Sequence, residues 1–350
     1  MRWRSWVVAL AVVLTGADLK VGPYTGGVVG AEVVGAGLPA GPDPIAVETI
    51  GLTVADLDRS VTFFTTVLAF EKVSETELAG RPYELLHGVF GARMRVARLR
   101  LGSEQIELTE YLAPRGRPYP ADTRGNDRWF QHIAIVVSDM ARAYARLREH
   151  GVAHASTAPQ RLPDWNRNAA GIEAYYFRDP DGHFLEVLAF PPGKGARQWQ
   201  RKDALFLGID HTAIVVASTD AALAFYRDAL GLSVAGGSEN YGEEQEHLNN
   251  VFGARLRITT LHAQRGAGIE LLEYLAPRDG RPAPLDLKAN DLAHWQTTIA
   301  GGNATALLAN QHGGGLVSPD VVRVDPEQVG FELGLMIRDP DGHAVRVVQR

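Results

Sequence analysis

Apolar and polar residues alternate along several short segments of the chain, and each such segment leads into a helical pattern. The segment ETIGLTVADLDRSVTFF, beginning at Glu48, passes from an alternating stretch through Asp and Ser residues typical of a helix start into an amphipathic helix. Segments beginning at Gln131 and Asp210 repeat this plan. The further strands expected in the first two modules are 92–99, 103–111, 174–177 and 183–189. Each module is therefore predicted to fold as strand–helix–strand–strand–strand, and the chain holds four modules.

The same motifs occur in the same order in both halves of the chain. VFGARMRVARL in the first half matches VFGARLRITTL in the second, and IELTEYLAPRGRP matches IELLEYLAPRDGRP. Repetition on this scale indicates a tandem duplication. We therefore predict repeat domains at 45–192 and 204–350, joined by a basic linker rich in Pro and Gly at 193–203.

The first 17 residues, MRWRSWVVALAVVLTGA, have the layout of a secretory signal: arginines, a short apolar run, then small residues. The apolar run is shorter than the roughly 20 residues that a membrane-spanning helix needs. Residues 18–44, rich in Gly and Val, are expected to form a flexible tether. The pattern predicts export, either to a periplasm or out of the cell.

Composition narrows the class of partner. The 350 residues suit two ordinary domains, and the chain is 45% hydrophobic and 22% charged, with a formal net charge of −6. No block of like charge predicts binding to nucleic acid or, beyond the signal segment, to a membrane, so we expect a small-molecule ligand. There are no cysteines, so a metal would need His, carboxylate, amide or hydroxyl ligands.

The motif RDPDGH occurs twice, as FRDPDGHFLEVL and IRDPDGHAVRVV. Pro fixes φ, Gly accepts positive φ and Asp bonds the local backbone, so the motif predicts a tight turn. We expect His183 and His343 to serve that turn. In the strand that follows, the first copy keeps a carboxylate at Glu186, whereas the second has Arg346.

The fourfold plan, the helices DLDRSVTFFTTVLAF and STDAALAFYRDALGL and the two RDPDGH hairpins resemble the vicinal oxygen chelate superfamily. That superfamily includes glyoxalase I, methylmalonyl-CoA epimerase, fosfomycin and bleomycin resistance proteins, and extradiol dioxygenases. The resemblance covers about 45–350. It implies an α+β fold in which two modules form one eight-stranded cup, giving two tandem cups. It also implies ligand positions on the first and last strand of each module, on the concave face.

Eight residues occupy these positions. We assign one set to an N-terminal cup: Thr49, Glu107, His132 and Glu186. We assign the other to a C-terminal cup: His211, Glu270, Gln296 and Arg346, with His294 two residues before Gln296. The alternative is that modules pair differently or exchange with a second chain, as in a homodimer, which would bring His211 to Glu107 or Glu186.

The N-terminal set supplies one imidazole and two carboxylates in Glu107, His132 and Glu186, which suits a divalent Zn, Mn, Fe, Ni or Co ion. Thr49 departs from the resemblance, because a neutral hydroxyl is a poor ligand. In the C-terminal set, Arg346 stays protonated and cannot coordinate a metal. That cup is therefore predicted to be metal-free or to bind an anion, with His211 and Glu270 as a two-ligand remnant.

Three classes of function follow from the resemblance. The first is a metal-dependent lyase or isomerase that acts on a small oxygenated substrate through an enediolate, with Glu107 or Glu186 moving the proton. The second is a non-catalytic protein that binds a small molecule, as bleomycin-resistance-like members do. The third, an extradiol dioxygenase, ranks last because neither set offers the two His and one carboxylate that Fe(II) requires there.

Overall fold

The computed structural model describes residues 45–350 apart from 302–303, 305–306 and 308–313. The expected signal (1–17) and tether (18–44) lie outside the described residues. None of the described helices is both long enough and apolar enough to cross a membrane.

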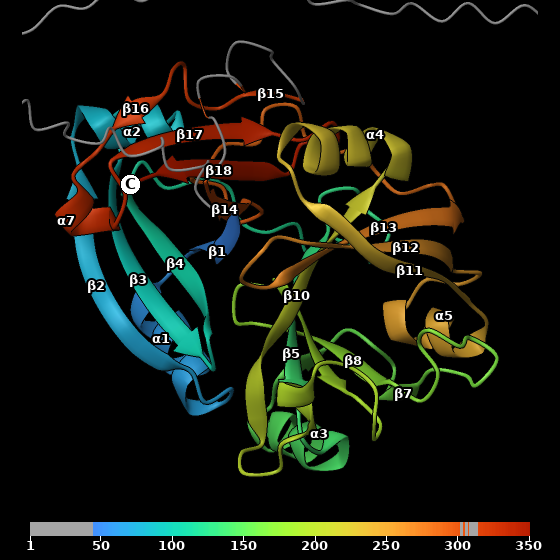
Figure 1. Cartoon of the computed structure of the whole chain (residues 1–350). Coiled ribbons are helices and arrows are strands. Elements are labelled where there is room, and N and C mark those ends of the chain that lie inside the picture. Colours follow the sequence, from blue (N-terminus) through green and yellow to red (C-terminus); the bar gives the residue numbers. More distant parts are fainter. Residues whose placement is uncertain (1–44, 302–303, 305–306, 308–313) are drawn as a thin grey trace, which may run out of the picture. The chain divides into compact units, whose positions relative to one another are not determined.

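Strands and helices alternate through four modules (Figure 1). Module 1 consists of β1 (Ala46–Val54), α1 (Leu57–Thr66), β2 (Glu71–Ala79), α2 (Arg81–His87), β3 (Arg93–Leu101) and β4 (Glu104–Ala113). Module 2 consists of β5 (Gln131–Val137), α3 (Met140–Glu149), β6 (Ala153–His154), β7 (Gln160–Arg161), β8 (Glu173–Arg178) and β9 (Phe184–Ala189). Module 3 consists of β10 (Phe206–Val216), α4 (Thr219–Leu223) with the π-helical continuation Ala224–Ala229, β11 (Ser233–Tyr241), α5 (Glu243–Asn249), β12 (Arg255–His262) and β13 (Gly268–Ala276). Module 4 consists of β14 (Trp295–Ala300), β15 (Gly315–Leu316), β16 (Val322–Arg323), α7 (Pro326–Val329), β17 (Leu333–Arg338) and β18 (Ala344–Gln349). The predicted α+β class and the four modules are confirmed.

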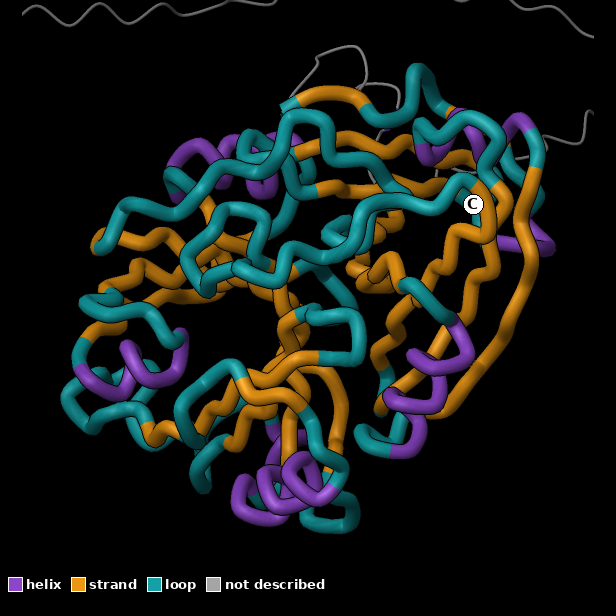
Figure 2. Tube along the Cα trace, turned by 180° about the vertical axis from the view of Figure 1, so that it is seen from behind, coloured by secondary structure: helices purple, strands orange, loops and turns teal. Residues whose placement is uncertain are grey.

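The helix starts follow from the capping residues visible in the sequence. The side chain of Asp56 accepts a hydrogen bond from the backbone N–H of Arg59 at the start of α1. Asp139 and Ser218 cap α3 and α4 in the same way. The helices lie at the periphery of the strands (Figure 2), so the strands' other faces are left to form the sites.

The pairing of the modules differs from the one predicted. β1 pairs antiparallel with β14, and β5 pairs antiparallel with β10, while each of these strands also pairs in parallel with the last strand of its own module. One sheet has the strand order β15-β17-β18-β14-β1-β4-β3-β2, and the other has β11-β12-β13-β10-β5-β9-β8-β6. Modules 1 and 4 therefore form one cup, here called cup 1–4, and modules 2 and 3 form the other, cup 2–3. The prediction of one cup per half of the sequence was wrong.

The two RDPDGH hairpins connect the sheets. In the first, Asp179 accepts from the backbone N–H of His183, and the ring of His183 donates to the carbonyl of Leu292 in the other half of the chain at 2.7 Å. Asp181 accepts from the N–H of Ala55, at the entrance to α1, at 3.0 Å. In the second hairpin, Asp341 accepts from the N–H of Ala217 at 2.9 Å.

Asp179, Asp181 and His183 lie close enough to hold a metal ion. Their ligand atoms already bond protein groups, however, because Asp179 also binds the His183 ring at 2.8 Å and Asp181 pairs with Arg59. This agrees with the structural role expected for the motif, and it explains why the turn is present twice although the carboxylate after it is not.

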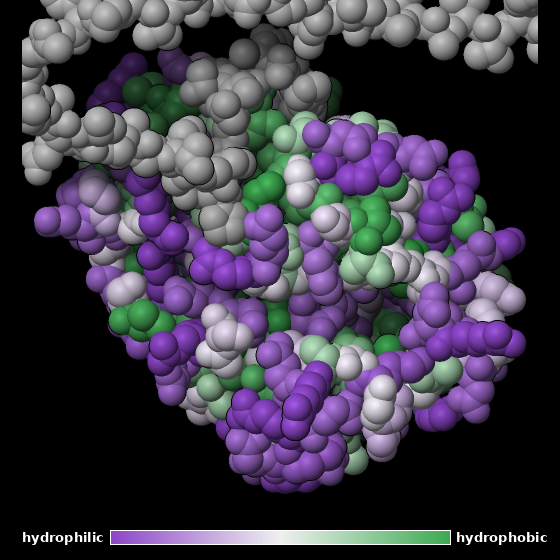
Figure 3. Space-filling model, in the orientation of Figure 1, coloured by the Kyte–Doolittle hydropathy of each residue, from purple (hydrophilic) through white to green (hydrophobic). Residues whose placement is uncertain are grey.

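Few large apolar side chains are exposed among the described residues, and two of them, Trp165 and Tyr241, pack against each other. Phe90 and Phe252, at equivalent positions of the two VFGAR motifs, are 85% and 92% exposed. On the face drawn in Figure 3, hydrophilic residues predominate among those described, with hydrophobic residues scattered between them. Isolated exposed apolar residues of this kind do not indicate an interface.

Candidate metal centre and cavity

Cup 2–3 brings together four of the eight predicted positions. His132 lies on β5, Glu186 on β9, His211 on β10 and Glu270 on β13. The strand register explains why they converge: Ala134 is the pairing partner of both Glu186 and His211, and it lies two residues from His132 on the same strand. Paired residues and residues two apart share a face of a sheet. All four side chains therefore point into the same cup.

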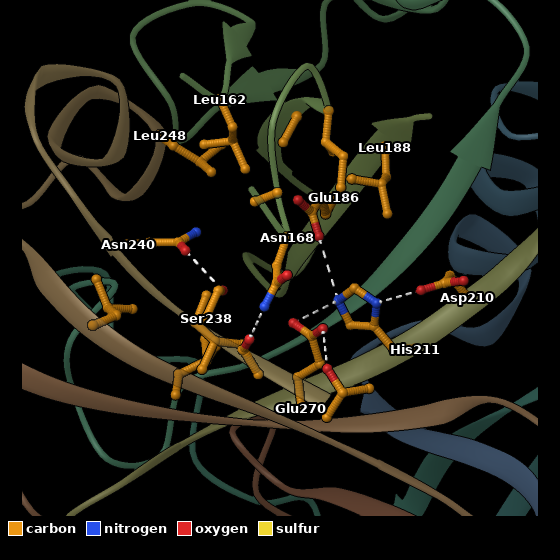
Figure 4. A pocket seen from close by; sticks show the side chains of 18 of the residues that line it. Leu162, Asn168, Glu186, Leu188, Asp210, His211, Ser238, Asn240, Leu248 and Glu270 are labelled. Carbon is orange, nitrogen blue, oxygen red and sulfur yellow. Dashed lines mark hydrogen bonds and ion pairs between the residues drawn. The ribbon is translucent and has the colours of Figure 1, made fainter. Parts of the chain in front are cut away.

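The ligand atoms of three of these residues lie close together. One oxygen of Glu186 lies 3.1 Å from Nε2 of His132 and 3.7 Å from Nε2 of His211. The ligand atoms of His132, Glu186 and His211 all lie within 4.8 Å of one another, and all three residues are buried. Glu270 is the fourth member, with an oxygen 3.4 Å from Nε2 of His211 (Figure 4).

His132 is the clearest indication that these residues suit a metal ion. It is 1% exposed; Nδ1 has no hydrogen-bond partner among the described residues, and Nε2 makes no hydrogen bond there although an oxygen of Glu186 lies 3.1 Å away. The rings of Phe130 and Tyr176 pack against it, at centroid distances of 5.6 and 4.8 Å. A buried polar group without a partner is costly. A cation bound at Nε2 beside Glu186 would remove that cost, and imidazole with carboxylate is a suitable donor set for a divalent ion.

His211 is oriented by a carboxylate behind it. Its Nδ1 donates to Asp210 at 2.9 Å, and Asp210 in turn accepts from the indole N–H of Trp199 at 2.7 Å. This leaves Nε2 of His211 directed at Glu186 and Glu270. Burial disfavours the charged ring, but the carboxylates of Glu270, Asp210 and Glu186 outweigh it and raise the pKa of His211 to about 10. The site thus concentrates negative charge that a cation can neutralise.

Replacing Asp210 by asparagine is expected to weaken metal binding by about 10- to 100-fold, the usual effect of losing a carboxylate that orients a ligating histidine. Zinc titration against a competing chelator measures the change. Asp203→Asn is the matched control, because Asp203 is an exposed linker carboxylate paired with Arg201. Equal affinities for wild type and Asp210→Asn would show that Asp210 does not support the site.

Cup 1–4 holds the other four predicted positions, and a charge pair occupies its centre. Glu107 binds Arg346 at 2.9 Å, and the side-chain amide of Gln296 donates to Glu107 at 3.2 Å. Arg98 lies 3.5 Å from the second oxygen of Glu107. Burial alone would raise the pKa of Glu107, but Arg346 and Arg98 hold it below the usual value. His294 lies beside Gln296, with 3.4 Å between the ring and the amide oxygen.

The predicted trio of Glu107, His132 and Glu186 is therefore wrong as a group. Glu107 lies in the other sheet from His132 and Glu186, and arginines already occupy its carboxylate. The residues assigned to a C-terminal cup divide in the same way, because His211 and Glu270 belong with His132 in cup 2–3. Sequence reasoning missed Asp210, for which the only signal was a carboxylate directly before His211.

The two cups differ in the free volume directly beside their central charged residues. A cavity of about 500 Å³ opens over His132, Glu186, His211 and Glu270. Inside cup 1–4 the cavity beside Glu107 and Arg346 measures about 20 Å³, with Val329 and Phe331 among its lining residues. Two cups are thus present, with the predicted residues divided differently between them; that one binds a metal and the other is degenerate stays a prediction.

An anion site around Arg346 stays a prediction. A hollow of about 480 Å³ beside β1 is lined by Arg98, Arg265, Arg346 and Arg350, but also by Glu48 and Glu104. Arg350 pairs with Glu48 at 2.5 Å, and Arg346 with Glu107, so much of this positive charge is already neutralised.

Thr49 corresponds in cup 1–4 to His211 in cup 2–3. It is buried, and its hydroxyl has no hydrogen-bond partner among the described residues. Thr49→Val is expected to leave metal content unchanged and to change the free energy of unfolding by less than about 1 kcal/mol, because no hydrogen bond within the described part of the chain is lost. Metal analysis and urea unfolding test this, and loss of metal in the variant would place Thr49 in a metal site.

Two βαβββ cups, one of which brings two histidines and two glutamates together, define the class of this protein. The sequence profile of the Glyoxalase/Bleomycin resistance protein/Dioxygenase superfamily matches residues 46–187 and 208–347, so the chain belongs to that superfamily.

Known proteins add three comparisons. A 2-epi-5-epi-valiolone epimerase from an Actinomyces species is 34% identical over 166 residues, covering 43% of this chain and 83% of that protein. Glyoxalase I from Zea mays superposes with a TM-score of 0.54 at 17% identity, covering 87% of this chain and 92% of that one. A putative dioxygenase from Bacillus subtilis gives a TM-score of 0.53 at 15% identity, covering 87% and 85%. The two structural matches show the fold alone.

Proposed function

We propose that this protein is a metal-dependent isomerase or epimerase that moves a proton at a carbon next to a carbonyl group. The observation that carries the proposal is the convergence of His132, Glu186, His211 and Glu270 beneath one cavity of about 500 Å³. The likeness to a protein named as an epimerase supports the same class of reaction.

His132, Glu186 and His211 would hold the metal, which is Zn, Ni, Mn or Fe by the nature of these donors. When bound, such an ion acts as a Lewis acid that polarises the substrate's oxygens. Asp210 keeps His211 in position for this task. The side chains of His132, Glu186 and His211 are each at most 7% exposed.

Glu270 is the group placed to move the proton. Its side chain is 21% exposed and lines the cavity, whereas that of Glu186 is 6% exposed. One oxygen of Glu270 accepts from the hydroxyl of Thr260 at 2.9 Å, which fixes the carboxylate. Glu270 accepts the proton from the substrate carbon and leaves an enediolate. Return of the proton to the neighbouring carbon, with transfer of the hydroxyl proton from one oxygen to the other, isomerises the substrate, and return to the opposite face of the same carbon epimerises it.

Exchange of the substrate's carbon-bound proton with solvent tests the proposal directly. Metal-loaded protein in D₂O is expected to introduce deuterium next to the carbonyl of an α-hydroxyketone, with 2-epi-5-epi-valiolone among those screened by NMR. Glu270→Gln should lower the exchange rate by about 10²- to 10⁴-fold, the usual contribution of a general base. Thr76→Ala, a change in cup 1–4, should leave it unchanged. Equal exchange by wild type and Glu270→Gln would remove Glu270 from the reaction.

An extradiol dioxygenase is the second candidate, and one observation favours it. His132, His211 and Glu186 form a two-His, one-carboxylate group, contrary to the prediction that no cup contains one. Glu270, a second carboxylate at this centre, favours the isomerase, because it occupies space that dioxygen and a catechol would share. Ring cleavage of catechol by Fe(II)-loaded protein in air, measured by absorbance, would establish the dioxygenase instead.

We also propose that the protein is exported, on the strength of the pattern in residues 1–17. Fractionation of cells that express the full chain is expected to recover it outside the cytoplasm, shortened at its N-terminus. Recovery of the full-length chain in the cytoplasm would contradict export.

A further inference from the structure

The cavity wall away from the metal-ligand group carries uncharged polar groups. Asn168, Ser238 and Asn240 line it (Figure 4), together with Gln245. Asn168 comes from module 2 and the other three from module 3, and the side chain of Asn168 donates to the carbonyl of Gly237 on β11 at 2.6 Å. The wall is therefore assembled from both modules of the cup.

Two of these residues belong to a chain of buried side-chain amides, here called the amide cluster, that continues from the wall into the protein: Asn166, Asn240, Gln245 and Asn249. Asn166 donates to Asn240 at 2.6 Å, Asn240 donates to Gln245 at 3.0 Å, and Gln245 donates to Asn249. Ser238 also donates to Asn240, at 2.8 Å. All four amides are buried, and the Nδ2 of Asn249 has no partner among the described residues. Burying so many amides is costly, so their presence calls for a reason.

Cup 1–4 shows that the fold does not require these amides. The strand pairs β2–β3 and β11–β12 share one register, in which Ala79 faces Arg93 and Tyr241 faces Arg255. Counting from these pairs gives the module 1 counterparts of Asn240, Gln245 and Asn249, which are Leu78, Tyr83 and His87. Asn240 thus occupies the position that the apolar residue Leu78 has in cup 1–4. The buried amides therefore occur in the cup that contains the cavity of about 500 Å³, and the βαβββ fold itself does not require them.

The charges around the cavity favour an uncharged ligand. Among the described residues that line it there is no Lys or Arg, whereas Glu186, Asp210 and Glu270 are all present. Three carboxylates outweigh the charge of one divalent cation. A phosphate or carboxylate on the substrate would therefore meet net negative charge with no counter-ion, at a cost that is large where water is excluded.

We propose that Asn168, Ser238, Asn240 and Gln245 form a subsite that recognises hydroxyl groups, and that the substrate is an uncharged polyhydroxylated ketone. The inference rests on the proposed isomerase function, for which it names the substrate class. Each amide has two N–H donors and two acceptor lone pairs, and the hydrogen bonds described above use only part of them. The unused donors of Asn240 and Gln245 and the unused acceptors of Asn168 and Ser238 can pair with substrate hydroxyls. Substrates that carry phosphate, carboxylate or a charged peptide are disfavoured.

Calorimetric titration of the zinc-loaded full chain tests this with two ring ketones: an inosose, which is an uncharged pentahydroxycyclohexanone, and dehydroquinate, which carries a carboxylate. The inosose is expected to bind at least about tenfold more tightly, because only dehydroquinate places a charge in the cavity. Asn240→Leu, which introduces the residue of cup 1–4, should weaken inosose binding by about tenfold and leave zinc content unchanged. Ser238→Ala should weaken it by a few-fold, whereas its counterpart Thr76→Ala should have no effect.

Two outcomes would overturn the subsite: tighter binding of dehydroquinate, or no binding of the inosose to zinc-loaded protein. If Asn240→Leu does not fold, the comparison of Ser238→Ala with Thr76→Ala decides. Deuterium exchange, recorded on the same samples, separates this inference from the proposed function. Inosose binding without exchange would keep the subsite and remove the isomerase, whereas exchange of charged ketones alone would keep the isomerase and remove the subsite.

Discussion

Glu186→Gln is expected to abolish metal binding. The carboxylate of Glu186 lies between Nε2 of His132 and Nε2 of His211, at 3.1 and 3.7 Å, so it is the member of the group that both histidines share. Glutamine keeps the shape but replaces one oxygen with an amide nitrogen and removes the charge that offsets the cation. We expect about one divalent metal per chain in the wild type and an affinity at least about a hundredfold lower in the variant, because loss of even a supporting carboxylate costs 10- to 100-fold.

Plasma mass spectrometry of protein purified without chelator or His-tag measures the metal content. Glu107→Gln is the informative control, because Glu107 would belong to the same site if each half of the sequence formed its own cup. In the observed fold Glu107 lies in cup 1–4, so its variant should retain the metal. Loss of metal from both Glu107→Gln and Glu186→Gln would place the two carboxylates in one site and reverse the grouping of the modules described above.

The Glu107→Gln control also separates the part of the site that the sequence could predict from the part that it could not. The position of each candidate ligand on its strand followed from the superfamily resemblance and from aligning the repeats, and Glu186 and Arg346 lie on the last strands of their modules as expected. The pairing of modules could not be read in this way. The first strands of all four modules alternate alike, so nothing in one strand alone selects its partner.

Contacts between the paired modules show why their pairing could not be predicted from the sequence. Arg117, after the last strand of module 1, binds Asp291 before the first strand of module 4 at 2.7 Å. Arg281, after module 3, binds Asp127 before module 2 at 2.6 Å. Both arginines come from Gly-Arg-Pro motifs and both aspartates from Asn-Asp motifs, so the sequence permits Arg117 to bind either aspartate. Only the three-dimensional arrangement distinguishes the two, and it decides whether His132 meets Glu107 or His211.

The second large effect concerns the free energy of unfolding, and it arises from the charge pair buried in cup 1–4. Arg346→Met is expected to lower the free energy of unfolding by about 3–5 kcal/mol, because it leaves the buried carboxylate of Glu107 without its main partner. The side chains of both residues are only 4% exposed. Arg98, at 3.5 Å from Glu107, retains part of the compensation, which places the effect at the lower end of that range.

The double variant Glu107→Gln/Arg346→Met separates the loss of the pair from the exposure of a lone charge. A buried ion pair contributes little net stability relative to uncharged residues of similar size, so the double variant should recover most of the stability that the single variant loses. Urea unfolding at neutral pH, with metal content recorded for each sample, measures both. Equal stability of wild type and Arg346→Met would show that Glu107 is not held by this arginine.

Lowering the pH should reduce the difference in free energy of unfolding between wild type and the double variant. Since Arg346 and Arg98 hold the pKa of Glu107 below its usual value of 4.5, the pair contributes stability above that pH. The contribution is lost as the pH falls through the lowered pKa of the folded state, where Glu107 takes up a proton. The double variant has no such group in cup 1–4, so its stability should fall less steeply over the same acidic range. Parallel decline of the two proteins would mean that the charge of Glu107 does not contribute to stability, whatever its distance from Arg346.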